Sequence, residues 1–302
     1  MKRLLRLSAL FLLVLAFFGC SSTREDIPAP ALADSISEII TSTLSGRAYQ
    51  ITVALPRGYA ESIESYPVLY MVDANGQFGT MVETARQLRF EETVPEMIIV
   101  GIGYPVGRMW DAQAPRNIDL TPTADPNWVQ QRAIDFPQYP APAGSGGAPV
   151  FLDFIISELI PTVEQDYRVD STNRAYYGHS FGGLFGVYAL LHNQGIFQRF
   201  IIASPSLWWD DKVSFRLESD YSASRSDLPA RVFFSMGALE THPMFDMVSN
   251  LEQFQSVLEA RQYEDFEYTV RYFEEETHNT VISRSIVRGL SWIYSNGKES
   301  GV

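Results

Sequence analysis

Residues 175–191 read AYYGHSFGGLFGVYALL and decide the organisation of this chain. A short apolar run leads into Gly178-His179-Ser180-Phe181-Gly182, and an almost wholly apolar segment follows. This is the G-x-S-x-G pattern in the order strand, tight turn and helix, which places a serine at the tip of a strained turn. A Cβ atom at either flanking glycine would collide with the neighbouring strand or helix. Because the serine would lie beside a helix N-terminus, negative charge that develops next to it is favoured. The pattern alone is also compatible with a chance glycine-rich turn, so the rest of the chain must decide.

The composition is that of a globular protein. The 302 residues suffice for one large α/β domain, and 46% of them are hydrophobic while 20% are charged. The formal net charge of −13 argues against nucleic acid and against anionic lipid surfaces as partners, because both require basic patches. The chain contains one cysteine, so no disulfide can form within it.

Residues 1–19 have the form of a targeting segment. Three basic residues precede an apolar run at 9–18, which is shorter than the ~20 apolar residues of a membrane-spanning helix. The run ends at Gly19-Cys20, which resembles a bacterial lipoprotein signal whose cysteine becomes the lipidated first residue. The alternative is a plain secretory signal with an incidental cysteine. Cleavage before Cys20 removes three positive charges and takes the formal net charge from −13 to −16.

The N-terminus therefore predicts a lipid-anchored protein of the bacterial cell envelope that faces the periplasm. Ser21 follows the cysteine, where an aspartate would suggest retention in the inner membrane, so the outer membrane is favoured. Residues 20–36 are polar and rich in proline and alanine, which is typical of a tether. We expect residues 37–302 to form a single domain.

Apolar runs suited to buried strands alternate along this domain with helical patterns. The strands predicted lie at 47–56, 67–72, 96–102, 175–177, 199–203, 231–236 and 266–273, and the helices at 150–167, 184–191, 247–262 and 280–294. Such alternation indicates an α/β fold with a mostly parallel sheet and helices on both faces. Pro161 is expected to kink or end the first of these helices.

Residues 103–148 interrupt the alternation with many prolines and glycines. A long irregular stretch inside a compact domain is usually a lid or a pocket wall. The alternative is a disordered surface insertion, against which Trp110 and Trp128 argue. Within this stretch, Arg116 and Asp119 are predicted to form a structural ion pair, and the alternative is that they bind substrate.

An activated serine needs a base within hydrogen-bonding reach and an acid that orients the base. In the nucleophile-elbow arrangement, the acid and then the base follow the ends of later strands. Of the four histidines, His278 lies between the last predicted strand and the closing helix, where the base is required. His242 is the second candidate. We expect His179 to be a packing residue and His192 to interact with the C-terminal end of its helix.

The acid should follow the strand at 231–236, and Glu240 lies there. Asp246 is further towards the next helix, and Asp210 and Asp211 follow an earlier strand. No cluster of histidine, cysteine and carboxylate residues has metal-ligand spacing, so we expect neither a metal nor a cofactor.

Several stretches together resemble the putative esterase family of α/β hydrolases, which includes esterase D and the ferric-siderophore esterases. The resemblance extends from about residue 47 to 296. The stretches that carry it are YPVLYMVDANGQF (66–78), IIVGIGYP (98–105), RNIDLTPT (116–123), ELIPTVEQDYRVD (158–170), GHSFGGLFGVYALL (178–191), SPSLWWDD (204–211) and ETHN (276–279).

This resemblance implies an α/β-hydrolase fold with Ser180 as the nucleophile and His278 as the base. The oxyanion hole is expected from the residue after the nucleophile, Phe181, and from Asn75 in the turn after the third strand. Some members of the family work with a Ser–His pair, so whether Glu240 is needed stays open.

The same resemblance places Trp208 and Trp209 near the site, either lining the substrate pocket or as buried core aromatics. We therefore expect a serine carboxylic-ester hydrolase that forms an acyl-enzyme on Ser180 with a small-molecule ester in the cell envelope. One alternative is a ferric-siderophore trilactone esterase, although a net charge of −16 runs against a trianionic ferric catecholate. The other is a non-catalytic binding lipoprotein on the hydrolase fold. The sequence does not indicate the oligomeric state.

Overall fold

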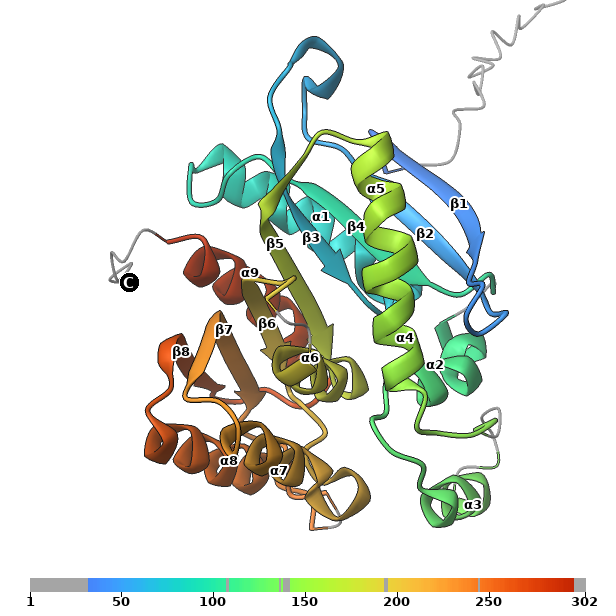
Figure 1. Cartoon of the computed structure of the whole chain (residues 1–302), viewed down its shortest axis with the longest axis vertical. Coiled ribbons are helices and arrows are strands. Elements are labelled where there is room, and N and C mark those ends of the chain that lie inside the picture. The colour runs from blue at the N-terminus through green and yellow to red at the C-terminus, as the bar shows by residue number, and fades with distance from the viewer. Residues whose placement is uncertain are drawn as a thin grey trace, which may run out of the picture. The chain divides into compact units, whose positions relative to one another are not determined.

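A computed structural model describes residues 32–106, 109–135, 137, 142–192, 195–243 and 245–295, with Met109 and Trp110 described in their backbone alone (Figure 1). The predicted signal peptide, Cys20 and most of the predicted tether lie outside these residues. Within the described residues, no helix has both the length and the apolar character needed to cross a membrane.

The centre of the described domain is an eight-stranded sheet in the order β1-β2-β4-β3-β5-β6-β7-β8 (Figure 1). Strand β1 pairs antiparallel with β2, β2 pairs antiparallel with β4, and all other neighbours are parallel. The sheet is therefore mostly parallel, as predicted. The strands are β1 (Ser35–Thr41), β2 (Ala48–Ala54), β3 (Tyr66–Met71), β4 (Ile98–Gly103), β5 (Val169–His179), β6 (Arg199–Ala203), β7 (Asp227–Gly237) and β8 (Glu264–Phe273).

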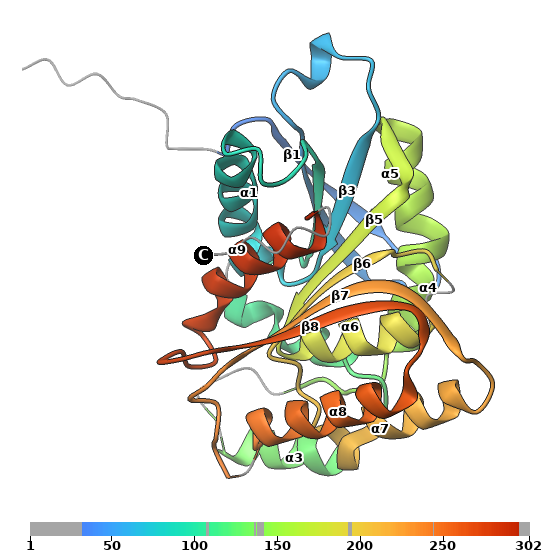
Figure 2. The same ribbon diagram turned by 90° about the vertical axis from the view of Figure 1, so that its left-hand side faces the viewer.

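Helices cover both faces of this sheet because successive strand residues point to opposite sides (Figure 2). Each face carries one cluster of buried hydrophobic residues. On β7, for example, Phe233 packs in the first cluster, and Val232 and Phe234 pack in the second. The first cluster contains α1 (Ala74–Phe90) and α9 (Val281–Ile293). The second contains α4 (Ala148–Phe154), α5 (Ile160–Asp166), α6 (Phe181–His192), α7 (Trp209–Ser222) and α8 (Met247–Arg261).

The prediction that residues 103–148 are irregular is wrong for the described part of this stretch. That part contains α2 (Gln113–Asp119) and α3 (Pro126–Asp135). Both helices are short, and α3 has no fully buried residue, so neither leaves a clear apolar period in the sequence.

Three further elements were not predicted from the sequence, namely β1, α1 and α7. Strand β1 begins at Ser35, inside the predicted tether, and it is an edge strand whose residues are mostly exposed. The helix predicted at 150–167 is present as α4 and α5, joined by a π-helical turn at Ile155–Leu159, and it continues through Pro161.

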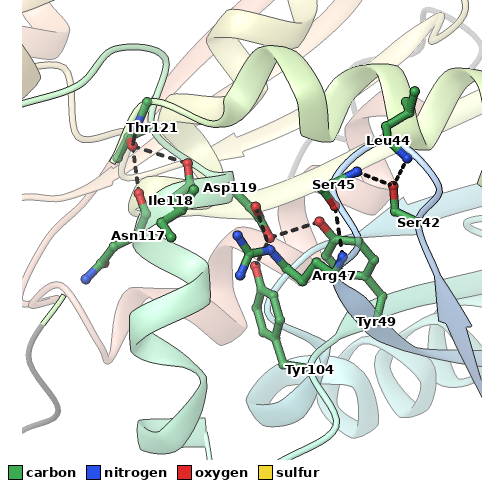
Figure 3. Close-up of polar contacts among 11 residues, drawn as sticks. Ser42, Leu44, Ser45, Arg47, Tyr49, Tyr104, Asn117, Ile118, Asp119 and Thr121 are labelled. Carbon is green, nitrogen blue, oxygen red and sulfur yellow. Dashed lines mark hydrogen bonds and ion pairs between the residues drawn. The ribbon is translucent and has the colours of Figure 1, made fainter. Parts of the chain in front are cut away.

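Helix α2 is held against the sheet by the buried carboxylate of Asp119 (Figure 3). Arg47 Nε lies 3.2 Å from Oδ1, and the hydroxyls of Tyr49 and Tyr104 donate to Oδ2 at 3.1 and 3.0 Å. The predicted pair between Arg116 and Asp119 is therefore wrong. The two side chains lie on one short helix but have different partners. Asp119 contacts Arg47, Tyr49 and Tyr104, whereas Arg116 pairs with Asp73.

This carboxylate should make stability depend on pH. Burial raises the pKa of Asp119 from its ordinary 3.8 to about 6, although Arg47 and the two tyrosine hydroxyls favour the charged form. The folded chain then binds more protons than the unfolded chain between about pH 4 and pH 6. The resulting stabilisation is complete below this window and is lost as the pH rises through it. In urea unfolding, the free energy of the wild type minus that of Asp119→Asn should fall by roughly 2–3 kcal/mol from pH 4 to pH 7. A difference that stays constant across this range would contradict the assignment.

Candidate functional site

The turn between β5 and α6 presents Ser180 in a left-handed backbone conformation, with φ of 64°. A Cβ atom on Gly178 would lie 2.3 Å from the Gly182 carbonyl oxygen, and one on Gly182 would lie 2.8 Å from Val72 Cγ2. The collisions predicted from the sequence are therefore present. Glycine at both positions lets the turn close tightly enough to expose the serine.

The structure brings three of the predicted side chains into one hydrogen-bonded chain. Ser180 Oγ lies 3.0 Å from His278 Nε2, and His278 Nδ1 lies 2.6 Å from Glu240 Oε2. They follow the carboxyl ends of the parallel strands β5, β8 and β7, which meet at one edge of the sheet. The Glu240 side chain is buried, whereas that of His278 is 39% exposed. This is the geometry of a serine whose proton can pass to an oriented imidazole.

The other candidates for the acid lie elsewhere, whereas His242, the second candidate for the base, is part of the pocket lining with His278. Asp210 pairs with Arg216 at 3.2 Å, and Asp246 stands at the N-terminus of α8. His192 ends α6, with Nδ1 2.8 Å from the Tyr188 carbonyl oxygen.

His179 is buried, and its ring lies directly against the base, 4.5 Å from the ring of His278 between centroids. Burial lowers the pKa of His179 well below its ordinary value, and the neighbouring His278 and Arg116 lower it further. The ring is therefore neutral at pH 7, so it packs beside the base without adding a positive charge. It is a packing residue, as predicted, but its contact with the base had no signal in the sequence.

The two predicted oxyanion donors occupy the first turns of their helices, Asn75 in α1 and Phe181 in α6. Backbone N–H groups in a first helical turn have no partner inside the helix, so they are available to an anion. The Asn75 side chain fixes its turn, because Nδ2 donates to the Tyr104 carbonyl oxygen and Oδ1 accepts from the Tyr104 N–H, each at 2.8 Å. The two turns adjoin, since a Cβ on Gly182 would lie 3.5 Å from Asp73 Oδ2.

Arg116 joins these two turns, a role that the sequence did not reveal. Its Nε and Nη2 donate to Asp73 Oδ1 and Oδ2 at 2.6 and 2.8 Å, and Nη2 also lies 3.3 Å from the His179 carbonyl oxygen. Arginine and aspartate are both buried, and such a bidentate pair fixes direction as well as distance. Helix α2 therefore buttresses the turn before α1 and the elbow together.

A pocket of about 550 Å³ opens over the three side chains. Trp208 lines it, and its contact with substrate stays a prediction. Trp209 does not, because it is fully buried behind the wall with Nε1 donating to the Thr123 carbonyl oxygen at 3.2 Å, so it is a core aromatic. Asn75 is not part of the lining, which consists of Gln113, Arg116, Asn117, Trp128, Arg132, Ser180, Phe181, Ser206, Trp208, Leu239, Glu240, His242, Phe245, Met247, Thr277 and His278.

Residues 113–132 contribute to this wall, as predicted for the stretch 103–148, whereas other lining residues such as Phe245 and Met247 were not singled out from the sequence. Trp128 of α3 packs edge-on against Phe181 at 5.4 Å between ring centroids, and Phe245 lies 4.7 Å from Trp208. Among the described residues, no three histidine, cysteine or carboxylate side chains are placed to hold a metal ion.

Comparison with known proteins gives consistent results. A family described as "Putative esterase" matches residues 42–281. Ferri-bacillibactin esterase BesA of Bacillus subtilis is 30% identical over 259 residues, which cover 83% of this chain and 86% of that protein. Siderophore triacetylfusarinine C esterase of Aspergillus fumigatus is 28% identical over 298 residues, covering 90% of this chain and 97% of that protein. The crystal structure of the BES protein from Bacillus cereus superposes with a TM-score of 0.76 at 27% identity and covers 91% of this chain and 100% of its own.

Proposed function

The chain belongs to the putative esterase family and is a serine ester hydrolase, and we propose that its acyl-enzyme forms on Ser180. The observation that carries this proposal is the hydrogen-bonded chain from Ser180 through His278 to Glu240, set beneath an open pocket. An ester carbonyl bound there would meet the serine oxygen and the first turn of α6 together.

In this mechanism, Ser180 Oγ attacks the ester carbonyl carbon while His278 Nε2 takes the hydroxyl proton. The N–H groups of Phe181 and Asn75 stabilise the oxyanion, and loss of one such donor typically costs roughly 3–4 kcal/mol of transition-state stabilisation. The protonated His278 then gives its proton to the leaving alcohol. A water molecule, deprotonated by the same histidine, hydrolyses the acyl-enzyme and regenerates the serine. Glu240 holds the imidazole in the required tautomer and stabilises its charged form.

For the substrate, we propose the ester bonds of a siderophore. Both relatives named above are siderophore esterases by name and align over most of their length. The aromatic wall of Trp128, Trp208 and Phe245 suits an acyl group with planar aromatic rings. The net charge of −16 expected after cleavage opposes an anionic ferric complex, and because Asp73 neutralises Arg116, Arg132 is the lining arginine that brings positive charge towards such a ligand.

Labelling of the serine tests the proposed mechanism, and a comparison of substrates tests the proposed siderophore specificity. A fluorophosphonate probe should label the wild type at Ser180, and kcat/KM for a trilactone siderophore should exceed that for short p-nitrophenyl esters at least tenfold. Running the ferric and the iron-free trilactone side by side shows which form is preferred. Labelling with a preference for simple acyl esters would favour a cell-envelope acyl esterase, and the absence of labelling would favour a binding lipoprotein.

We also propose that the protein is lipidated at Cys20 and anchored in the bacterial cell envelope, facing the periplasm. The support is the basic, apolar and Gly-Cys order of residues 2–20. The full chain should incorporate radiolabelled palmitate and should lose this label in a Cys20→Ser variant, and a label that persists in the variant would contradict lipidation at this cysteine.

A further inference from the structure

The hydroxyl of Ser204 contacts the acid of the site from the side opposite the base. Ser204 follows β6, is fully buried and has a φ of 41°, in the left-handed region. Its Oγ donates a hydrogen bond to Glu240 Oε1 at 2.6 Å. The other oxygen of the same carboxylate, Oε2, bonds to His278. The hydroxyl and the imidazole therefore hold the two ends of one carboxylate.

The contacts at Glu240 divide in a way that fixes its orientation. Oε1 accepts from Ser204 Oγ and from the Gly237 N–H, the latter at 2.8 Å, whereas Oε2 faces His278. Rotation of the carboxylate about its last side-chain bond would break all three contacts. Without the hydroxyl, only one N–H would hold Oε1, and the buried carboxylate could turn or tilt.

The backbone around Ser204 is bonded to the nucleophile as well. The Ser180 N–H donates to the Ala203 carbonyl oxygen at 3.0 Å, and the Ser206 N–H donates to the Ser180 carbonyl oxygen at 3.2 Å. The Ser204 N–H donates to the Ser235 carbonyl oxygen at 2.8 Å. A non-glycine residue with positive φ persists only where its surroundings determine it, and these bonds do so on both sides of Ser204.

We infer that Ser204 is a positioning residue, which fixes Glu240 relative to Ser180 so that the acid presents Oε2 to the base. The backbone of segment 203–206 is hydrogen-bonded to Ser180, and the Ser204 side chain is hydrogen-bonded to Glu240. The segment therefore fixes the position of the acid relative to the nucleophile. This inference rests on the proposed function. It adds a fourth side chain, which acts through Glu240 and does not touch the substrate.

Two substitutions at Ser204 and one matched control test this role. Ser204→Ala removes the hydroxyl, and Ser204→Gly removes it while accepting the positive φ without strain, so at least one variant should fold. Each should lower kcat for a p-nitrophenyl ester about tenfold to a hundredfold and leave KM within about twofold, as expected for the loss of one hydrogen bond to a charged group that orients the base. The control is Ser235→Ala on the adjacent strand, which removes an equally buried hydroxyl bonded to Ser285 and should keep the wild-type kcat.

A double-mutant cycle separates positioning from general packing. If Ser204 acts through Glu240, then Ser204→Ala should change kcat less than about twofold in a Glu240→Gln background. An equal loss in both backgrounds, or full kcat in both Ser204 variants of an active enzyme, would overturn this inference alone. A wild type that neither hydrolyses esters nor reacts with a fluorophosphonate would overturn the proposed function, and this inference with it.

Discussion

Replacing Ser180 with alanine is expected to lower kcat for a short p-nitrophenyl ester by roughly 10⁵–10⁶-fold. The variant loses the only oxygen in the site that lies within hydrogen-bonding distance of His278 Nε2 among the described residues, so no acyl-enzyme can form. The residual rate should come from the oxyanion donors and from binding alone, as in other serine hydrolases that lack their nucleophile.

The fold should survive this change, which makes the result interpretable. Alanine at a φ of 64° is about as strained as serine, and one hydrogen bond to a partly exposed imidazole is lost. The free energy of unfolding should therefore change by no more than about 1 kcal/mol. Steady-state kinetics with the p-nitrophenyl ester measures the loss of kcat, and urea unfolding of both proteins measures the change in stability. Ester hydrolysis at the wild-type rate by a folded Ser180→Ala variant would contradict the mechanism.

The elbow and the order of serine, acid and base could be predicted because each depends on residues close together in the chain. Gly178 is required by a contact with Gly182 inside the same turn, and Glu240 and His278 each lie a few residues after a strand with a clear apolar pattern. Parallel strands end at the same edge of the sheet, so local patterns were sufficient to assemble these residues.

The contacts that support the site could not be predicted, because they join residues with no relation along the chain. Asp73 and Arg116 are 43 residues apart, and Ser204 and Glu240 are 36 apart. No spacing rule covers a bond between the loops of different strands. The prediction failed for Arg116 in particular because it considered a partner on the same helix, whereas the guanidinium reaches the turn before α1.

Trp208 and Trp209 show a second limit of sequence reasoning. Adjacent residues of the same type give the same signal, yet one lines the pocket and the other is fully buried. The two side chains start from consecutive Cα atoms of a turn and point in different directions, and the chain turns again directly after them, where Asp210, Asp211 and Lys212 all have positive φ before the regular part of α7 begins. Three non-glycine residues in this conformation leave no reliable mark on composition or periodicity.

Glu240→Gln is expected to lower kcat about 10⁴-fold, and the measurement decides between a triad and a Ser–His pair. The hydrogen bonds at this residue dictate the size of the effect. Ser204 Oγ and the Gly237 N–H both donate to Oε1, so the carbonyl oxygen of a glutamine must stay on that side. Its NH₂ group then faces His278 Nδ1, which can only accept that bond if the ring proton moves to Nε2. The base would thus present N–H instead of a lone pair to Ser180.

The matched control for this variant is Glu218→Gln, a second buried carboxylate. Glu218 bonds to Arg261 and Tyr263 and lies outside the pocket lining, so its amide should cost stability but leave kcat unchanged. A loss below about tenfold in Glu240→Gln would mean that His278 is oriented without the acid, as in a Ser–His pair. Because the isosteric amide keeps the volume and the Ser204 bond, a large loss would follow from the tautomer that the carboxylate imposes, and a shorter aspartate at this position should recover only part of the rate.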